Sequence, residues 1–340
     1  MSKRSIIFGG TGLLVVATAG IFLLSRNDAN PPPLVTSSSP TPALAVNAGS
    51  IANLEFAVEH PAITADGRLV FATHRNTALA TANADGKGFK LLTGQEFPYI
   101  ESVAWSPDGS KAIVKSAGNR TVLFTGEGKP LQDLNPSIAN VAWSPDGERY
   151  AYTFGNDRVP QISEGSGFRG LSETPLGDRF AWSPDGKRLA AFDSQGGDLV
   201  IVNLEGGQLT KTGQSGISSV SWSPDGQRLL LTTGKGANRS LVLFDPAASK
   251  ANPAGLPGIA EKSAWISPEE FLVASPESLP DDYLENPLPL DDKLWRVRAD
   301  GSKEAVTSFD QEAKAIRFLI DRRLLVVTNT KVYEITLGAR

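Results

Sequence analysis

One seven-residue motif recurs four times in this chain at a nearly constant interval. The copies read VAWSPDG, VAWSPDG, FAWSPDG and VSWSPDG, and their tryptophans are Trp105, Trp143, Trp182 and Trp222. These tryptophans are 38, 39 and 40 residues apart. A period near 40 residues is typical of folds in which each repeat is one supersecondary unit packed against its neighbours. The repeat therefore predicts a repeat architecture.

Three weaker copies raise the number of units to seven. A degraded copy, WISPEE, begins at Trp265, and ITADGRLVFAT begins at Ile63. In the last copy, IRFLIDRRLLVVT, Phe318 takes the place of the tryptophan. Seven units between residues 51 and 340 give about 41 residues each, near the ~40 to 45 of a four-stranded propeller blade. We therefore predict an all-β protein, a β-propeller of seven four-stranded blades, with six blades as the alternative.

The repeated motif has the composition of a tight turn between two strands. Proline presets φ at the second position of a type I turn, aspartate suits the third, and glycine supplies the positive φ that closes the hairpin. Apolar and polar residues alternate on both sides of the motif, as in half-buried strands. We expect the tryptophans to fill the core between blades. The predicted structural residues are Trp105, Asp108, Gly109, Trp143, Asp146, Gly147, Trp182, Asp185, Gly186, Trp222, Asp225 and Gly226.

A second recurrent turn separates a third strand from a fourth in each unit. It contains Asp85-Gly86, Gly126-Glu127-Gly128, Glu205-Gly206-Gly207 and Asp300-Gly301. The last unit ends with KVYEITLGAR and lacks a fourth strand, whereas a spare strand-like run, Ile51 to Glu59, precedes the first unit. We predict that an N-terminal strand joins the last blade, which closes the ring and removes its open edges.

The repeats resemble the PD40, or WD40-like, family found in the TolB propeller and in the propellers of prolyl oligopeptidase-type and tricorn proteases. The resemblance covers roughly residues 60 to 340 and lies in WSPDG and the apolar strand after it. It implies a protein-interaction propeller, and for TolB a periplasmic role with a peptidoglycan-associated lipoprotein. This chain has no preceding α/β domain, seven units instead of six, and an apolar N-terminal segment, so we carry over the fold and not the TolB partner. Peptidase activity is excluded because no GxSxG motif is present.

An apolar segment near the N-terminus predicts a membrane anchor. Residues Ile6 to Leu24 are uncharged, and a helix of this length approaches the ~30 Å hydrocarbon thickness of a bilayer. Lys3 and Arg4 precede it, which places the N-terminus inside the cell. We predict a cytoplasmic tail (1–5), a transmembrane helix (6–24), a Pro/Ser-rich linker (25–50) and an extracytoplasmic propeller (51–340). A cleaved signal peptide, with a site at Ala43-Leu44-Ala45, is the alternative.

The composition argues against several functional classes. The chain has no cysteine and only two histidines, His60 and His74, which leaves little material for thiol or imidazole chemistry. Its net charge of −4 gives no basic field for nucleic acid. The stretch IIFGGTG has Val15 where a dinucleotide loop needs its third glycine. We expect no cofactor, no metal and no catalytic residues.

Candidate binding residues lie on the propeller face opposite the WSPDG turns, where the loops vary most. Four turns there carry arginine beside or near asparagine: Arg75, Arg120, Arg158 and Arg239. A ring of arginines could bind carboxylates or phosphates. The alternative is that asparagine serves the turn geometry and arginine the solubility.

The sixth unit contains one large acidic insertion, Pro276 to Asp292, without a basic residue. Its central candidates are Asp281, Asp282, Tyr283 and Glu285. Such a loop could dock a basic partner or cover the central channel, or it could be plain loop elaboration. The carboxylates of the insertion also suggest a calcium site, but their spacing does not fit an EF-hand loop.

Three functional classes follow from these observations. The leading one is a non-catalytic, membrane-tethered extracytoplasmic scaffold that binds a protein or other component of a bacterial cell envelope. The alternative is a small-molecule-binding or hydrolytic propeller, with its ligand at the mouth of the central channel between the four arginines. The third is a purely structural spacer.

Overall fold

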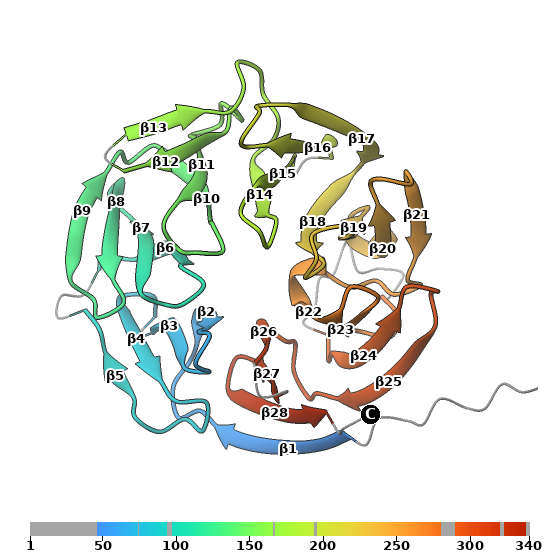
Figure 1. Cartoon of the computed structure of the whole chain (residues 1–340). Helices are drawn as coiled ribbons and strands as arrows, with labels where there is room; N and C mark the ends of the chain where they lie inside the picture. The colour runs from blue at the N-terminus through green and yellow to red at the C-terminus, as the bar shows by residue number, and fades with distance from the viewer. Residues whose placement is uncertain are drawn as a thin grey trace, which may run out of the picture. The chain divides into compact units, whose positions relative to one another are not determined.

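Seven four-stranded antiparallel sheets form a closed ring, as predicted (Figure 1). The computed structural model describes residues 46–73, 75–93, 97–165, 167–193, 196–279, 290–319 and 323–337. In these ranges the helical elements are two short 3₁₀ turns, η1 (Gly236–Asn238) and η2 (Ala260–Lys262). The predicted seven-bladed propeller is therefore confirmed, and the six-bladed alternative is wrong.

Blades 1 to 6 each consist of four consecutive strands in sequence order, with the first strand innermost. Blade 1 contains β2 (Glu59–Ile63), β3 (Leu69–Thr73), β4 (Ala78–Ala82) and β5 (Lys90–Leu91); blade 2 contains β6 (Ile100–Trp105), β7 (Lys111–Ser116), β8 (Arg120–Thr125) and β9 (Pro130–Leu134); blade 3 contains β10 (Ile138–Trp143), β11 (Tyr150–Phe154), β12 (Gln161–Glu164) and β13 (Gly167–Gly170). Blade 4 contains β14 (Arg179–Trp182), β15 (Arg188–Phe192), β16 (Asp198–Asn203) and β17 (Leu209–Ser215); blade 5 contains β18 (Ile217–Trp222), β19 (Leu229–Thr233), β20 (Ser240–Asp245) and β21 (Lys250–Pro253); blade 6 contains β22 (Ser263–Ser267), β23 (Glu270–Ser275), β24 (Lys293–Arg298) and β25 (Lys303–Ser308).

Blade 7 combines the two ends of the propeller. Its inner strands are β26 (Ala315–Phe318), β27 (Arg323–Val327) and β28 (Lys331–Leu337), and its outermost strand is β1 (Val46–Asn53). This confirms closure by an N-terminal strand. The strand begins earlier than the predicted run because β28 offers partners as far as Leu337, which pairs with Val46. The run Ile51 to Glu59 is divided between the end of β1 and the first residue of β2.

The WSPDG segments form the predicted turns between first and second strands. In blade 3 the amide of Gly147 donates to the carbonyl of Ser144 across 2.9 Å, and Gly147 has φ of +69°. The hydroxyl of Ser144 donates to the Asp146 carboxylate across 2.5 Å. We call the side of the ring with these turns the repeat-turn face. The opposite face carries the turns between second and third strands and the links between blades.

In blades 2 to 6, the repeat tryptophan connects the blade to the preceding one. The indole nitrogen Nε1 of Trp143 donates to the carbonyl of Ala104 across 2.8 Å, and that of Trp182 donates to the carbonyl of Ala142 across 2.9 Å. Trp222 repeats the contact in the next blade. Trp182 is 8% exposed, so its ring lies in the core between blades, as expected.

In blades 2 to 5, a basic residue six positions after the tryptophan connects the blade to the following one. Arg149 donates to the carbonyl of Gly186 across 3.2 Å, and its guanidinium lies 5.2 Å from the centroid of the Trp182 ring. Lys111, Arg188 and Arg228 reach the next blade in the same way. Because such a cation bonds to a backbone carbonyl and can also stack on the neighbouring tryptophan, it resists separation of the blades.

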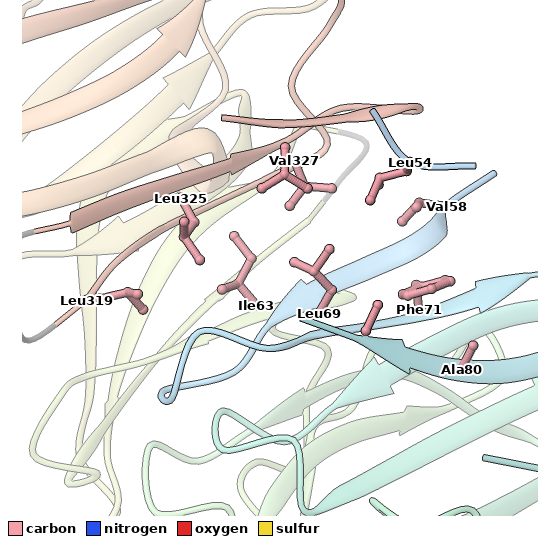
Figure 2. Close-up of a cluster of buried hydrophobic side chains, with 11 residues drawn as sticks. Leu54, Val58, Ile63, Leu69, Phe71, Ala80, Leu319, Leu325 and Val327 are labelled. Carbon is pink, nitrogen blue, oxygen red and sulfur yellow. The ribbon is translucent and has the colours of Figure 1, made fainter. Parts of the chain in front are cut away.

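The seam between blades 7 and 1 is closed by packing as well as by hydrogen bonds. Figure 2 shows the apolar cluster at the seam, where Leu319, Leu325 and Val327 of the last blade approach residues of the first. Arg317 of β26 also donates to the carbonyls of Ile63 and Pro107 across 2.8 and 2.7 Å. On the side of the first blade, the cluster contains Leu54 and Val58 from the segment before β2. It also contains Ile63, Leu69, Phe71 and Ala80 from blade 1 itself.

Candidate functional site

The four candidate arginines lie on the opposite face, in or beside turns between second and third strands. Arg120 forms an ion pair with Asp133 of its own blade, at 3.3 Å. Arg158 reaches Asp193 in blade 4 at 2.6 Å, and Nε of Arg239 donates to the carbonyl of Pro257 across 2.6 Å. Arg75 is exposed, with φ of +59°.

These arginines have separate surroundings. Arg120 lines a cavity between blades 1 and 2, whereas Arg158 lines another between blades 3 and 4. The structure thus confirms the face on which they lie, and it pairs Arg120 and Arg158 with different carboxylates. Their binding of an anion stays a prediction.

The acidic insertion connects β23 to β24 on the opposite face. Asp281, Asp282, Tyr283 and Glu285 lie outside the described residues. The ends of the insertion are described, and Glu277 pairs there with Lys293, the first residue of β24.

The last residue of the insertion belongs to a buried network that joins blades 6 and 7. Asp292 is 1% exposed and accepts hydrogen bonds from Lys262 and from the amide of Ala313, at 3.4 and 2.9 Å. Lys262 also binds Glu312 across 2.6 Å. Burial raises the pKa of the Asp292 carboxyl, and the charge of Lys262 opposes this rise. Sequence reasoning placed Asp292 in the insertion but missed Lys262, which lies three residues before Trp265 of the degraded repeat copy.

An apolar hollow of about 440 Å³ lies between the outer parts of blades 1 and 2. Phe97, Pro98 and Phe124 contribute to its walls, and Arg120 is its charged residue. Each of two lining prolines is followed by an exposed apolar side chain: Tyr99, 50% exposed, follows Pro98, and Leu131, 55% exposed, follows Pro130. The hollow combines apolar surface with one arginine that already has an acidic partner.

A second cavity, of about 330 Å³, lies close to the centre of the ring. Its walls come mainly from the two inner strands of blade 2 and the innermost strand of blade 3, and Arg179 reaches it from β14 of blade 4. Two cationic side chains line it, Lys115 and Arg179, and neither forms an ion pair with a described residue. None of the lining residues is acidic.

Sequence reasoning missed Lys115 and Arg179, although the repeat contains a signal for both. Lys115 lies ten residues after Trp105, where blade 3 has Thr153. Arg179 lies three residues before Trp182, where blade 2 has Ser102. Blade 5 also has hydroxyl residues at these two positions, Thr232 and Ser219, so an alignment of the units by their tryptophans would have marked both cations as departures.

The described residues contain no cluster of three or more His, Asp or Glu side chains that could hold a metal ion. The backbone carbonyl of His60 accepts the Trp105 indole hydrogen bond, while His74 lies outside the described residues. Among the described residues, the structure contains no helix with the length and apolar character needed to cross a membrane. The predicted span, Ile6 to Leu24, falls outside those ranges.

Comparison with known proteins agrees with the repeat. The family model described as WD domain, G-beta repeat matches residues 207–245. This segment runs from the turn before β17 to the end of β20. No curated protein matches the chain.

Solved structures with similar folds include the crystal structure of the mitotic checkpoint complex, at 16% identity and a TM-score of 0.58, covering 95% of this chain and 99% of that one. Virginiamycin B lyase from Staphylococcus aureus matches at 14% identity and a TM-score of 0.58, covering 87% and 100%. The Cps50 (Swd1) β-propeller domain of Myceliophteria thermophila matches at 13% and 0.60, covering 86% and 100%. At these identities the likeness shows the fold alone, which is that of a WD40-like β-propeller.

Proposed function

We propose that this propeller is a non-catalytic scaffold that binds a protein partner at the hollow between blades 1 and 2. WD40-like propellers commonly serve as protein-interaction scaffolds, and the crystal structure of the mitotic checkpoint complex contains one of similar fold. The observation that carries the proposal is the hollow itself, with Tyr99 and Leu131 exposed beside it. Aromatic and apolar anchors around one arginine are the composition found at the centres of protein interfaces.

We further propose that residues 6–24 hold the scaffold at a membrane, with the propeller outside the cytoplasm, in a bacterial cell envelope. The support is the uncharged segment Ile6 to Leu24, with Lys3 and Arg4 before it. The linker after this segment is rich in proline and serine, which favours an extended spacer.

A site-specific photo-crosslinker tests the proposed docking site. Placed at Leu131 in the full chain in its native cells, it should give a discrete adduct with one protein. The matched control position is Phe168 on β13, which is also an exposed apolar residue of an outermost strand and is 62% exposed. Serine at Tyr99 should weaken the adduct formed from position 131. Equal adducts at both positions, or none at position 131 in folded protein, would contradict the docking site.

Fractionation of cells tests the anchor. The full chain should sediment with membranes and resist extraction by high salt, and a chain that begins at residue 25 should become soluble. Protease added outside the cytoplasmic membrane should degrade the propeller of the full chain. Recovery of the intact chain in the cytosolic fraction would contradict the proposal.

A further inference from the structure

We propose that the cavity of about 330 Å³ near the centre of the ring binds a small organic acid, whose carboxylate is held by Lys115 and Arg179. This site is distinct from the docking hollow, because the two cavities have no lining residue in common. It also contains none of the four arginines predicted to form a ring.

The charges of the cavity favour an anion. Lys115 and Arg179 both line it, and neither is neutralised by an ion pair in the described part of the chain. By contrast, Lys111, on the same strand as Lys115, lies 3.2 Å from the Glu148 carboxylate. Two unpaired cations at one cavity provide charge-assisted hydrogen bonds, which carboxylates accept strongly.

A buried hydroxyl at the same wall lacks a partner. Thr121 is 2% exposed, and its hydroxyl oxygen Oγ1 has no hydrogen bond. Lys115 is the register partner of both Ser102 on β6 and Thr121 on β8, so all three side chains lie on one side of blade 2 and line the cavity. A buried hydroxyl without a hydrogen-bond partner destabilises the fold. A carboxylate oxygen beside Lys115 would give this hydroxyl an acceptor.

The rest of the cavity favours an apolar body on the acid. Val103, Ile113, Ile138 and Val141 line it together with the polar residues. Its volume lies at the lower end of the range of small-molecule sites, roughly 300–1,000 Å³. An inorganic anion would leave this apolar wall unfilled, and a folded partner would not fit. A compact organic acid uses both the cations and the apolar wall.

One acid interacts electrostatically with the proposed site from outside its walls. The Glu261 carboxyl of η2 interacts electrostatically with the Arg179 guanidinium, although the two residues, both in the described ranges, form no ion pair. Glu261 is exposed to solvent, but the surrounding protein atoms partly desolvate its carboxyl and raise its pKa, and Arg179 opposes that rise. When it is ionised, Glu261 competes with a bound carboxylate for the field of Arg179. Its removal should therefore strengthen binding of an acid.

The test uses the purified full chain with 4-fluorobenzoate, and its neutral counterpart 4-fluorobenzamide, followed by ¹⁹F NMR titration. The acid should bind at least about tenfold more tightly than the amide. Lys115→Met and Arg179→Met should each weaken the binding of 4-fluorobenzoate about tenfold or more. Methionine is chosen because it largely retains the apolar stem of Lys115. Lys250→Met removes the same charge from an exposed position on β21 and should leave affinity unchanged. Glu261→Gln should raise affinity about twofold to fivefold.

The Thr121→Val substitution distinguishes a loss of affinity for the acid from a loss of stability. Valine has nearly the shape of threonine and removes a hydroxyl without a partner, so the variant should be at least as stable as the original chain. Its affinity for 4-fluorobenzoate should nevertheless fall. Unfolding midpoints of all variants would identify any loss of affinity that comes from loss of structure.

Several outcomes would overturn the assignment. Equal binding of acid and amide, no binding of the acid at about 10 mM, or unchanged affinity in Lys115→Met and Arg179→Met would each do so. A loss in Lys250→Met equal to that in Lys115→Met would mean that general surface charge attracts the acid. The C-terminus of a peptide is a second possible source of the carboxylate. The binding of N-acetyl-valyl-alanine and of its C-terminal amide is therefore measured in the same titration. Tenfold tighter binding of this peptide acid than of 4-fluorobenzoate would overturn the small-acid occupant.

Discussion

Arg188 of blade 4 donates from Nη2 to the carbonyl oxygen of Gly226 in blade 5 across 2.7 Å. The same guanidinium lies 5.0 Å from the centroid of the Trp222 ring. Trp222 in turn donates to the carbonyl of Ala181 in blade 4 across 2.9 Å. Two successive copies of the repeat therefore contact each other in both directions across the interface between blades 4 and 5.

Replacement of Arg188 with methionine should lower the free energy of unfolding by about 1–3 kcal/mol, because a charged hydrogen bond and a cation–π contact are lost together. Urea unfolding followed by tryptophan fluorescence measures the change. Lys250→Met, in an exposed position on β21, is the matched control and should change stability by less than about 0.5 kcal/mol. Equal effects of the two substitutions would show that the contact contributes nothing.

Removal of β1 should open the ring. A chain that begins at residue 46 keeps all seven blades complete, whereas one that begins at residue 54 leaves β28 without its outer partner. We expect the shorter chain to melt at least about 5 °C lower, since 1 kcal/mol corresponds to roughly 2–4 °C in a large domain. It should also self-associate through the exposed edge of β28. Calorimetry and light scattering measure both effects, and identical behaviour of the two chains would contradict them.

The repeat aspartates should contribute to stability at neutral pH and not in strong acid. The hydrogen bond from the Ser144 hydroxyl is the largest cause that lowers the pKa of Asp146 below 3.8. The pKa values of Asp185 and Asp225 are also lowered: burial opposes the shift, but hydrogen bonds from Ser183 and Ser223 and from backbone amides outweigh it. A lowered folded-state pKa adds stability above the unfolded value, and this is lost as the pH falls through the folded value.

The triple variant with asparagine at these three aspartates tests the pH dependence. Asparagine keeps an acceptor for each serine hydroxyl but carries no charge. The variant should be less stable than the original chain at pH 7, by under about 1 kcal/mol per site because the carboxylates are exposed. The difference should vanish near pH 2, which urea unfolding across the range would show. A difference that is constant with pH would refute the explanation.

Two glycines in equivalent turns should respond differently to alanine. Gly128 and Gly207 both precede a fourth strand and have φ of +81° and +69°. A Cβ at Gly128 would lie 1.8 Å from the carbonyl oxygen of Leu92 in the preceding blade's link, whereas a Cβ at Gly207 meets nothing within 4 Å. Gly207→Ala should cost about 1–2 kcal/mol from backbone strain alone, and Gly128→Ala a further 1–3 kcal/mol from the clash. Equal losses in urea unfolding would contradict the role of Leu92.

The features that the sequence predicted correctly are those set by neighbouring residues in the chain. The Ser-Pro-Asp-Gly turns follow from local backbone preferences, so the position of Gly147 and its positive φ could be expected. The count of seven blades followed from the spacing of these turns. Closure of blade 7 followed from one missing strand and one spare strand, although the strand starts at Val46 because its partner, β28, determines how far pairing extends.

The binding surfaces depend on residues from different blades, and a single sequence does not show which of these meet. Lys115 and Arg179 come from blades 2 and 4, and only the geometry of the ring brings them to one cavity. Likewise Arg158 could be placed on a face from its turn, but its pairing with Asp193 depends on how blade 3 packs against blade 4. Repeat register could have marked Lys115 as unusual, without showing what lies opposite it.

The composition of blade 7 also determines the order in which the propeller can be completed during synthesis. The ribosome makes β1 before any other strand of the ring and β28 after all of them, yet these two strands are hydrogen-bonded neighbours. The outer strand of the last blade must therefore wait, unpaired, while six blades are made and folded. Such a late, long-range contact is slow to form and leaves strand edges available for aggregation. A nascent chain that stops before Lys331 would have all of blades 1 to 6 and no way to close them.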